Sequence, residues 1–218
     1  MNTRGLWGAA LLLGTIGGCL TEQVSLVPPA HVRFYSVDYS TTLVWTSPSK
    51  SPSLKHYVQW KIYGEPRWLD VDECQGITEP KCDLSNVTSG LTEWYYARVH
   101  SSSSAAKSAW TTSRRFSPRW DSKISPPLLK LHATPKGITV RVKPPRAHAQ
   151  VRMKHSDLLY KIILTGESGQ EKELEMECCS YKLKDVKRKA RYCFQAQTIL
   201  PLQARSSVRT EAKCITSQ

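Results

Sequence analysis

The sequence of 218 residues contains no motif of a common catalytic site. Neither the Gly-x-Ser-x-Gly turn of serine hydrolases nor the His-Glu-x-x-His pair of zinc peptidases occurs, and no cysteine and histidine stand in the setting of a nucleophile and its base. The seven cysteines form no paired Cys-x-x-Cys units and the six histidines are scattered, whereas metal sites need such clusters. An enzyme is therefore the least favoured class, and we expect neither a metal nor a cofactor.

Long apolar runs are also scarce. The only one covers residues 6–16, follows Arg4 and leads into a Gly-Gly-Cys sequence, a pattern typical of a signal peptide. Such a segment would span about 16 Å as a helix, against roughly 30 Å of bilayer hydrocarbon, so a membrane anchor is a poor second choice. A bacterial lipoprotein signal is a weaker interpretation because a eukaryotic glycosylation sequon occurs at Asn86. We expect residues 1–20 to be removed and the mature chain to be a secreted monomer without a transmembrane segment.

Sustained apolar heptads are absent, and 13 prolines and 11 glycines interrupt the chain, which argues against a coiled coil or a helical bundle. Turn residues recur about every eight to twelve positions, the spacing of short sandwich strands. Between the turns every second residue is apolar, as in Val58-x-Trp60-x-Ile62 and Tyr192-x-Phe194-x-Ala196. The pattern predicts an all-β fold in which Trp45 and Trp60 face the core.

The second half of the sequence repeats the plan of the first about a hundred residues later. In each half a proline pair precedes an edge strand, and a strand that begins at Tyr95 or Tyr192 comes late. We predict two tandem β-sandwiches, residues 21–118 and 127–218, joined by a linker at residues 119–126. Residues 20–118 contain ten Lys and Arg against nine Asp and Glu, whereas residues 119–218 contain twenty against nine. The excess positive charge therefore belongs to the second sandwich.

Several motifs occur together in the order and spacing of a known family. In the first half they are Tyr57-Val-Gln-Trp-Lys-Ile-Tyr-Gly64, Trp68, Cys74 and Cys82, Tyr95-Tyr-Ala-Arg-Val99, Ser108-Ala-Trp110 and Arg115-Phe116; in the second they are Lys123-Ile-Ser-Pro-Pro127, Tyr192-Cys193 and Cys214. This set resembles the class II cytokine receptors, the group that includes tissue factor and the interferon and interleukin-10-family receptors. The resemblance covers nearly all of the mature chain and implies two fibronectin type III, immunoglobulin-like sandwiches.

The resemblance also implies two disulfides, Cys74 with Cys82 and Cys193 with Cys214. Cys178 and Cys179 depart from the family pattern, and the sequence leaves open whether they form a vicinal bridge, remain free thiols or link two chains. Asn86 begins the sequon Asn-Val-Thr beside a serine and a glycine, so we expect an exposed, glycosylated loop.

Three aromatic residues are expected to have structural roles. Tyr95 and Tyr192 each begin a strand with alternating apolar residues, which is typical of a tyrosine corner whose hydroxyl bonds to nearby backbone. Trp110 is expected to stack with Arg98 and Arg114 in a cation–π arrangement.

Tyr63 is the residue that we expect to anchor a ligand. Val58, Trp60 and Ile62 are the inward residues of its strand, so Tyr63 is expected to lie outside the core at the strand end. Binding interfaces concentrate energy on such exposed tyrosines. The resemblance also implies that the main ligand-contacting tyrosine lies in this loop. The alternative is that Tyr63 only packs on Trp68 or covers the turn. By the family geometry, the ligand touches loops gathered at the elbow between the domains. The expected contacts are Gly64, Glu65, Thr88, Ser89, Gly90 and Lys107, the last in the loop of residues 102–107, with residues 146–155 and 199–203 from the second domain.

A basic run lies near the end of the chain. Its cations are Lys182, Lys184, Lys187, Arg188, Lys189 and Arg191. The simplest interpretation is a solvated loop, and the alternative is a site for a sulfated glycosaminoglycan such as heparan sulfate. Nucleic acid is not an expected partner of an exported chain.

The resemblance implies a function in binding. Most family members continue into a transmembrane helix, whereas this sequence ends four residues after Cys214, as in soluble members. We therefore expect a secreted receptor that binds and sequesters a helical cytokine of the interleukin-10/interleukin-22 family and blocks its signalling receptor. One alternative is a shortened ligand-binding chain for another interferon or interleukin-10-family cytokine. Another is a glycosaminoglycan-binding adhesion or protease-cofactor module.

Overall fold

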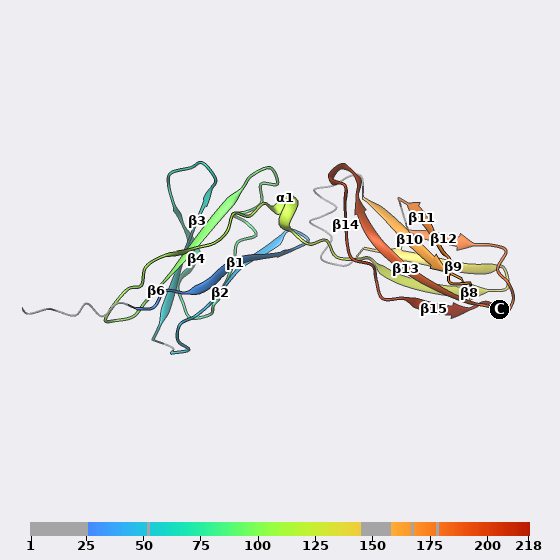
Figure 1. Ribbon diagram of the computed structural model, residues 1–218, viewed down its shortest axis with the longest axis horizontal. Helices are drawn as coiled ribbons and strands as arrows, with labels where there is room; N and C mark the ends of the chain where they lie inside the picture. Colours follow the sequence, from blue (N-terminus) through green and yellow to red (C-terminus); the bar gives the residue numbers. More distant parts are fainter. Residues whose placement is uncertain (1–25, 52, 145–157, 167, 178) are drawn as a thin grey trace, which may run out of the picture.

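The computed structural model describes residues 26–51, 53–144, 158–166, 168–177 and 179–218, and these form two β-sandwiches placed end to end (Figure 1). In the first sandwich, one sheet has the order β1-β2-β5 and the other the order β4-β3-β6-β7. The strands are β1 (Ala30–Val37), β2 (Ser40–Thr46), β3 (Lys55–Ile62), β4 (Leu69–Ile77), β5 (Lys81–Asp83), β6 (Tyr95–Ser102) and β7 (Thr111–Thr112). The predicted all-β class with two tandem sandwiches is confirmed.

The core of the first sandwich lies between its two sheets. Leu43 and Trp45 of β2 are buried, and they face the buried Val58 of β3 and Val99 of β6. Trp60 is partly buried and packs against the same cluster. The period-two alternation of apolar residues therefore produces this core, as the sequence predicts, because successive side chains of a strand point to opposite faces of its sheet.

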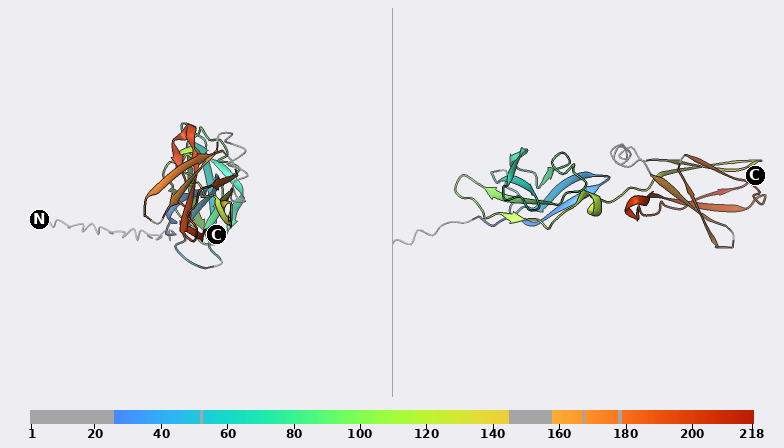
Figure 2. Two further views of the ribbon diagram at one scale, coloured as in Figure 1. Left: turned by 90° about the vertical axis from the view of Figure 1, so that its right-hand side faces the viewer. Right: turned by 90° about the horizontal axis from the view of Figure 1, so that it is seen from above.

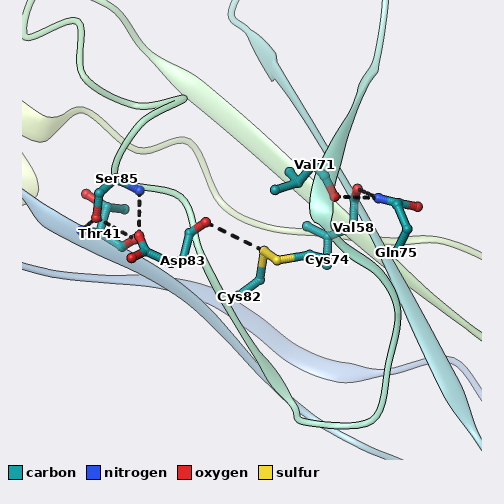
Figure 3. The surroundings of a disulfide bond; sticks show 8 residues. All are labelled: Thr41, Val58, Val71, Cys74, Gln75, Cys82, Asp83 and Ser85. Carbon is teal, nitrogen blue, oxygen red and sulfur yellow. Dashed lines mark hydrogen bonds between the residues drawn. A yellow bond between two sulfur atoms is a disulfide. The ribbon is translucent and has the colours of Figure 1, made fainter.

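A disulfide fastens the two sheets of the first sandwich at their edges (Figure 3). Cys74 of β4 is bonded to Cys82 of β5, and the two strands are edge strands of opposite sheets. The pairing of β3 with β4 is irregular beside this bridge, and the Gln75 amide compensates by donating to the carbonyls of Val58 at 2.7 Å and Val71 at 2.9 Å. The predicted Cys74–Cys82 disulfide is confirmed and connects the two separate sheets of the sandwich.

The second sandwich has a three-stranded sheet of order β12-β9-β8 and a larger sheet in which β11, β10, β13 and β14 follow one another and β15 also pairs with β13. Cys193 and Cys214 lie opposite each other in the pairing of β13 with β15, and they form the second predicted disulfide. The strands are β8 (Leu128–Thr134), β9 (Gly137–Lys143), β10 (Leu159–Thr165), β11 (Glu171–Met176), β12 (Ser180–Leu183), β13 (Arg191–Leu200), β14 (Arg205–Ser206) and β15 (Lys213–Thr216).

The segment between the sandwiches pairs with the first one. It begins with the short helix α1 (Pro118–Asp121) and then runs beside the end of β1, where the Asp38 amide donates to the Lys123 carbonyl at 2.8 Å. The Ser125 amide donates to the Asp38 carboxylate at 2.8 Å, and the hydroxyls of Ser36 and Ser122 are 2.7 Å apart. These hydrogen bonds fix the direction in which the chain leaves the first sandwich.

A small apolar cluster, here called the elbow core, joins the two sandwiches. It consists of the buried Tyr39, Ile124 and Leu200, with Leu91 and Leu158 packed against them. Tyr39 belongs to the turn between β1 and β2, Leu200 ends β13, and Ile124 comes from the connecting segment. Both sandwiches therefore contribute to one packed junction. The connecting segment with α1 lies between the two sandwiches in Figure 1 and in the right-hand view of Figure 2.

Polar contacts surround the elbow core. The Arg205 guanidinium donates to the backbone carbonyls of Arg119 and Ser122 in the connecting segment. The Thr198 hydroxyl donates to the Ser125 carbonyl at 3.0 Å. Burial raises the pKa of the Tyr39 hydroxyl above its ordinary value, so this group stays neutral in its hydrogen bond with the Gln203 side chain.

Candidate ligand-binding site

Tyr63 follows β3 directly and points away from the core, with 58% of its surface exposed. Its backbone amide donates to the Trp94 carbonyl at 2.6 Å, and Lys61 Nζ donates to the Glu65 carbonyl at 3.0 Å. Gly64 has φ of 90°, a left-handed conformation that glycine adopts at little cost. The turn after β3 is therefore held by the backbone amide of the exposed tyrosine itself and by a side-chain hydrogen bond from Lys61 to Glu65.

Aromatic and cationic side chains gather around Tyr63. The Tyr96 ring centroid lies 6.2 Å from that of Tyr63, and the Arg115 guanidinium is 5.7 Å from the Tyr63 ring. The same guanidinium stacks 4.0 Å from the ring of Trp94. We call Tyr63, Trp94, Tyr96 and Arg115 the Tyr63 cluster. The contacts of the Tyr63 ring are with Tyr96 and Arg115. Trp68, the alternative packing partner of Tyr63, instead contacts Lys61 and Arg98.

Sequence reasoning selected Tyr63 and missed the other three members of the cluster. Tyr96 follows the inward-facing Tyr95, so strand alternation alone places it on the outer face. Trp94 and Arg115 have no such signal, because both lie outside the strands, next to the isolated bridge between Tyr95 and Phe116. Tyrosine, tryptophan and arginine are the residues that most often dominate binding energy at protein interfaces. The cluster is therefore suited to protein recognition.

A second stack supports the sheet from which the cluster projects. The Arg98 guanidinium lies between Trp68 at 4.3 Å and Trp110 at 4.4 Å, and its Nε donates to Gln59 Oε1 at 2.8 Å. Partial burial lowers the pKa of Arg98, which remains charged because ordinary arginine titrates far above neutral pH. The predicted stack of Trp110 with Arg98 is confirmed, while the predicted partner Arg114 lies on an exposed stretch outside it.

The turn of residues 88–90 has a structural role that the sequence did not predict. The Thr88 side chain is only 2% exposed, and its hydroxyl donates to the Leu84 carbonyl at 2.8 Å. A Cβ on Gly90 would lie 2.7 Å from Tyr95 Oη, so glycine is required for the tyrosine corner to form. Thr88 is therefore directed into the domain and Gly90 is held against Tyr95, while Ser89 is the exposed residue of the turn; contact of Thr88, Ser89 and Gly90 with a ligand stays a prediction.

The loop that contains Lys107 lies far from the elbow. Lys107 pairs with Ser102 at the end of β6, whereas Tyr95 at the start of β6 pairs with Phe116, just before the connecting segment. The eight residues of β6 span about 23 Å. The expected position of Lys107 beside Tyr63 is therefore wrong, because Tyr63 lies at the end of the β3–β6 pair where β6 begins and Lys107 lies at the end where β6 finishes.

The second domain contributes one described loop to the elbow. Leu200 is buried in the elbow core, and the 3-10 helix η2 (Pro201–Gln203) follows it with Leu202 78% exposed. The other expected loop, residues 146–155, lies outside the described residues. The exposed Leu202 is therefore a candidate contact within the expected loop of residues 199–203.

The remaining predicted positions are distributed over the surface. Asn86 is exposed in a turn and borders a 790 Å³ cleft between the edge strands β4 and β5, away from the Tyr63 cluster. Cys178 lies outside the described residues, whereas Cys179 is disulfide-bonded and its carbonyl accepts from the Val142 amide at 2.9 Å. Cys179 is therefore not a free thiol.

The fold and the site together define a receptor-type binding module of two tandem fibronectin type III domains. In the part of the chain that the structure describes, histidine, cysteine and acidic side chains form no group that could hold a metal ion. None of the described helices is long and apolar enough to cross a membrane.

Comparison with known proteins specifies the family. Residues 6–110 match the tissue factor family, and residues 122–218 match the interferon-alpha/beta receptor fibronectin type III family. The two matches follow one another along the chain and together cover nearly all of it. The chain therefore belongs to the class II cytokine receptors.

Individual relatives agree with this assignment. Interleukin-22 receptor subunit alpha-2 of Mus musculus is 29% identical over 216 residues, which cover 94% of each chain. Interleukin-22 receptor subunit alpha-1 of Bos taurus is 33% identical over 174 residues, 76% of this chain and 30% of the relative. The crystal structure of the chicken interferon gamma receptor alpha chain has the same fold, with a TM-score of 0.78 at 22% identity over 88% of this chain and 99% of that one.

Proposed function

We propose that this protein is a secreted receptor that binds an interleukin-22-like helical cytokine and withholds it from its signalling receptor. The observation that supports the proposal best is the Tyr63 cluster, an exposed aromatic group beside an arginine at the elbow end of the first domain. The relatives named for interleukin-22 support the choice of cytokine. On this proposal the protein inhibits cytokine signalling because it competes with the signalling receptor for one face of the cytokine. This inhibition involves no covalent step.

The contact surface on this proposal has two parts. The first domain supplies Tyr63 with Gly64, Glu65 and Ser89, and the second supplies Leu202 on η2. The loops are exposed while the elbow core beneath them is packed, so the two parts are presented in a fixed relation. A preorganised surface of this kind loses little conformational entropy when it binds.

Alanine substitution of Tyr63 tests the anchor. We expect Tyr63→Ala to raise the Kd for interleukin-22 about 30-fold in surface plasmon resonance, since removal of a central interface tyrosine costs roughly 2 kcal/mol or more. The matched control is Tyr35→Ala, because Tyr35 is 55% exposed on the other sheet of the same domain. The control is expected to change the Kd less than twofold.

The outcomes separate the parts of the proposal. Equal affinity of wild type and Tyr63→Ala for interleukin-22 would exclude Tyr63 as the anchor. Binding of another interleukin-10-family cytokine or an interferon in place of interleukin-22 would favour a ligand-binding chain of different specificity. Cells that express the full sequence should release a shortened chain into the medium, and its retention inside the cells contradicts secretion.

A further inference from the structure

One sheet of the second domain has an outer surface on which the charged side chains are all basic. In β9, Ile138, Val140 and Val142 are buried, so Arg141 and Lys143 point outward. In β8 and β12 the same alternation leaves a further set of side chains exposed. We call the outward group the basic sheet face, and it consists of Lys130, His132, Arg141, Lys143 and Lys182.

The strand register brings these basic side chains together. Arg141 of β9 lies directly opposite Lys130 of β8, and Thr139 lies between His132 on one side and Lys182 on the other. Residues opposite each other in neighbouring strands have Cβ atoms roughly 5 Å apart, and like charges at this distance destabilise a sheet. The chain therefore maintains a crowded group of cations at a cost in stability.

No acidic residue within this sheet compensates the charge. The sequences of β8, β9 and β12 contain neither aspartate nor glutamate. Among the described residues, the ion pairs of the second domain lie on the opposite sheet, where Lys161 binds Glu173 at 2.8 Å and Arg209 binds Glu171 at 2.9 Å. Charge is thus separated between the two outer surfaces of the sandwich.

The basic run identified in the sequence is divided by the fold. Lys182 belongs to the basic sheet face, while Arg191 begins β13 in the opposite sheet. Between them, Lys187 belongs to an anchored loop, since its amide donates to Tyr192 Oη at 2.9 Å and its carbonyl accepts from the Ser217 hydroxyl. Lys184 lies next to Gly137 at the turn between β8 and β9, so it extends the basic sheet face.

We infer that the basic sheet face binds a sulfated glycosaminoglycan. A linear chain of sulfates matches an exposed sheet surface with several cations that form no ion pair with any other residue the structure describes, and binding would release the counterions that both surfaces hold. Arginine pairs with oxyanions through two parallel N–H groups, which suits Arg141 at the centre of the face. Acidic phospholipids are a weaker fit, since they are concentrated on the cytoplasmic leaflet and this chain begins with a predicted export signal.

Retention on immobilised heparin tests the inference with the full secreted chain. The triple variant Lys130→Gln/Arg141→Gln/Lys143→Gln is expected to bind heparin roughly tenfold more weakly at physiological salt, with a shallower dependence of affinity on salt concentration. The matched control Arg33→Gln/Lys50→Gln/Lys55→Gln removes three exposed cations from the first domain and should leave retention nearly unchanged. Heparin from which the sulfates have been removed should not bind wild type.

A single substitution distinguishes lost binding from lost folding. Lys130→Glu places a carboxylate opposite Arg141, so we expect the melting temperature to stay the same or rise while heparin affinity falls. Interleukin-22 binding should be unaffected by any of these changes, because the face lies away from the Tyr63 cluster.

Three results would overturn the inference. The first is unchanged heparin affinity in the triple variant. The second is loss of binding only in Lys187→Gln/Arg188→Gln/Lys189→Gln, which would place the site on the loop instead. The third is binding to phosphatidylserine vesicles without binding to heparin.

Discussion

Two tyrosines show how one side chain holds a loop in each domain. Tyr95 Oη accepts from the Gly90 amide at 3.2 Å, and Tyr192 Oη accepts from the Lys187 amide at 2.9 Å. Both hydroxyls bond to backbone a few residues upstream, as the sequence predicts for tyrosine corners. The second example fixes part of the basic loop, so its lysines extend from an ordered backbone.

His56 is a buried titratable residue that the sequence did not distinguish. Its side chain is 1% exposed, its two ring nitrogens lie 3.1 Å from the hydroxyls of Ser47 and Ser101, and its ring packs edge-on against Trp45. Burial lowers the pKa of His56, with a smaller contribution from His100, so the folded protein favours the neutral ring. Protonation of this histidine therefore opposes folding.

We expect the free energy of unfolding to fall as the pH drops below about 6.5, the pKa of histidine in an unfolded chain. The unfolded chain then binds more protons than the folded one, which favours unfolding. In urea denaturation at pH 7.5 and pH 5.0, His56→Gln should lose less stability on acidification than wild type. Equal losses in the two proteins would show that His56 does not titrate on unfolding. The pKa of His100 is also lowered, so part of the dependence should persist in the variant.

At the scale of elements, alternation within a strand was predictable and the partners of a strand were not. The buried Val58 and the exposed Tyr63 follow from a period of two along one segment. The crowding of Lys130 against Arg141 follows from the register between β8 and β9, and the addition of Lys182 from the pairing of β12. A basic face built from three separate strands cannot be recognised as a run in the sequence.

The two disulfides are expected to differ in their contribution to stability. Cys74 and Cys82 are separated by 8 residues and Cys193 and Cys214 by 21, so the second closes a longer loop in the unfolded chain. Replacement of either pair by alanine should lower the free energy of unfolding by about 2–4 kcal/mol. The loss should be about 1 kcal/mol larger for the second pair than for the first. Chemical denaturation measures both, and a larger loss for the first pair contradicts the loop-entropy argument.

At the scale of the whole molecule, the elbow determines what the protein can present to a partner. Tyr39, Ile124 and Leu200 come from both sandwiches and the segment between them, and Arg205 bonds to that segment from β14. Domains in one chain move relative to each other unless their interface is substantial. The packed junction therefore sets the relation of the Tyr63 cluster to η2.

Removal of the Arg205 contacts should loosen the elbow. We expect Arg205→Met to leave the melting of each domain nearly unchanged while broadening the distribution of interdomain distances in small-angle X-ray scattering. The affinity of Arg205→Met for a cytokine that contacts both domains should also fall. Arg209→Met is the matched control, since Arg209 binds Glu171 on the second domain alone. Equal scattering from wild type and Arg205→Met would show that the elbow core is sufficient.

The sequence by itself determined the two sandwiches, their cores and the exposure of Tyr63, because these depend on side-chain alternation within short segments. The two disulfide pairings followed from the family resemblance. Only the tertiary structure decided that Lys107 lies at the far end of β6, that Thr88 is buried, and that Arg191 faces away from Lys182. The physical reason is that the position of a loop depends on which strands pair and in which register. Those choices are made by contacts between residues far apart in the chain.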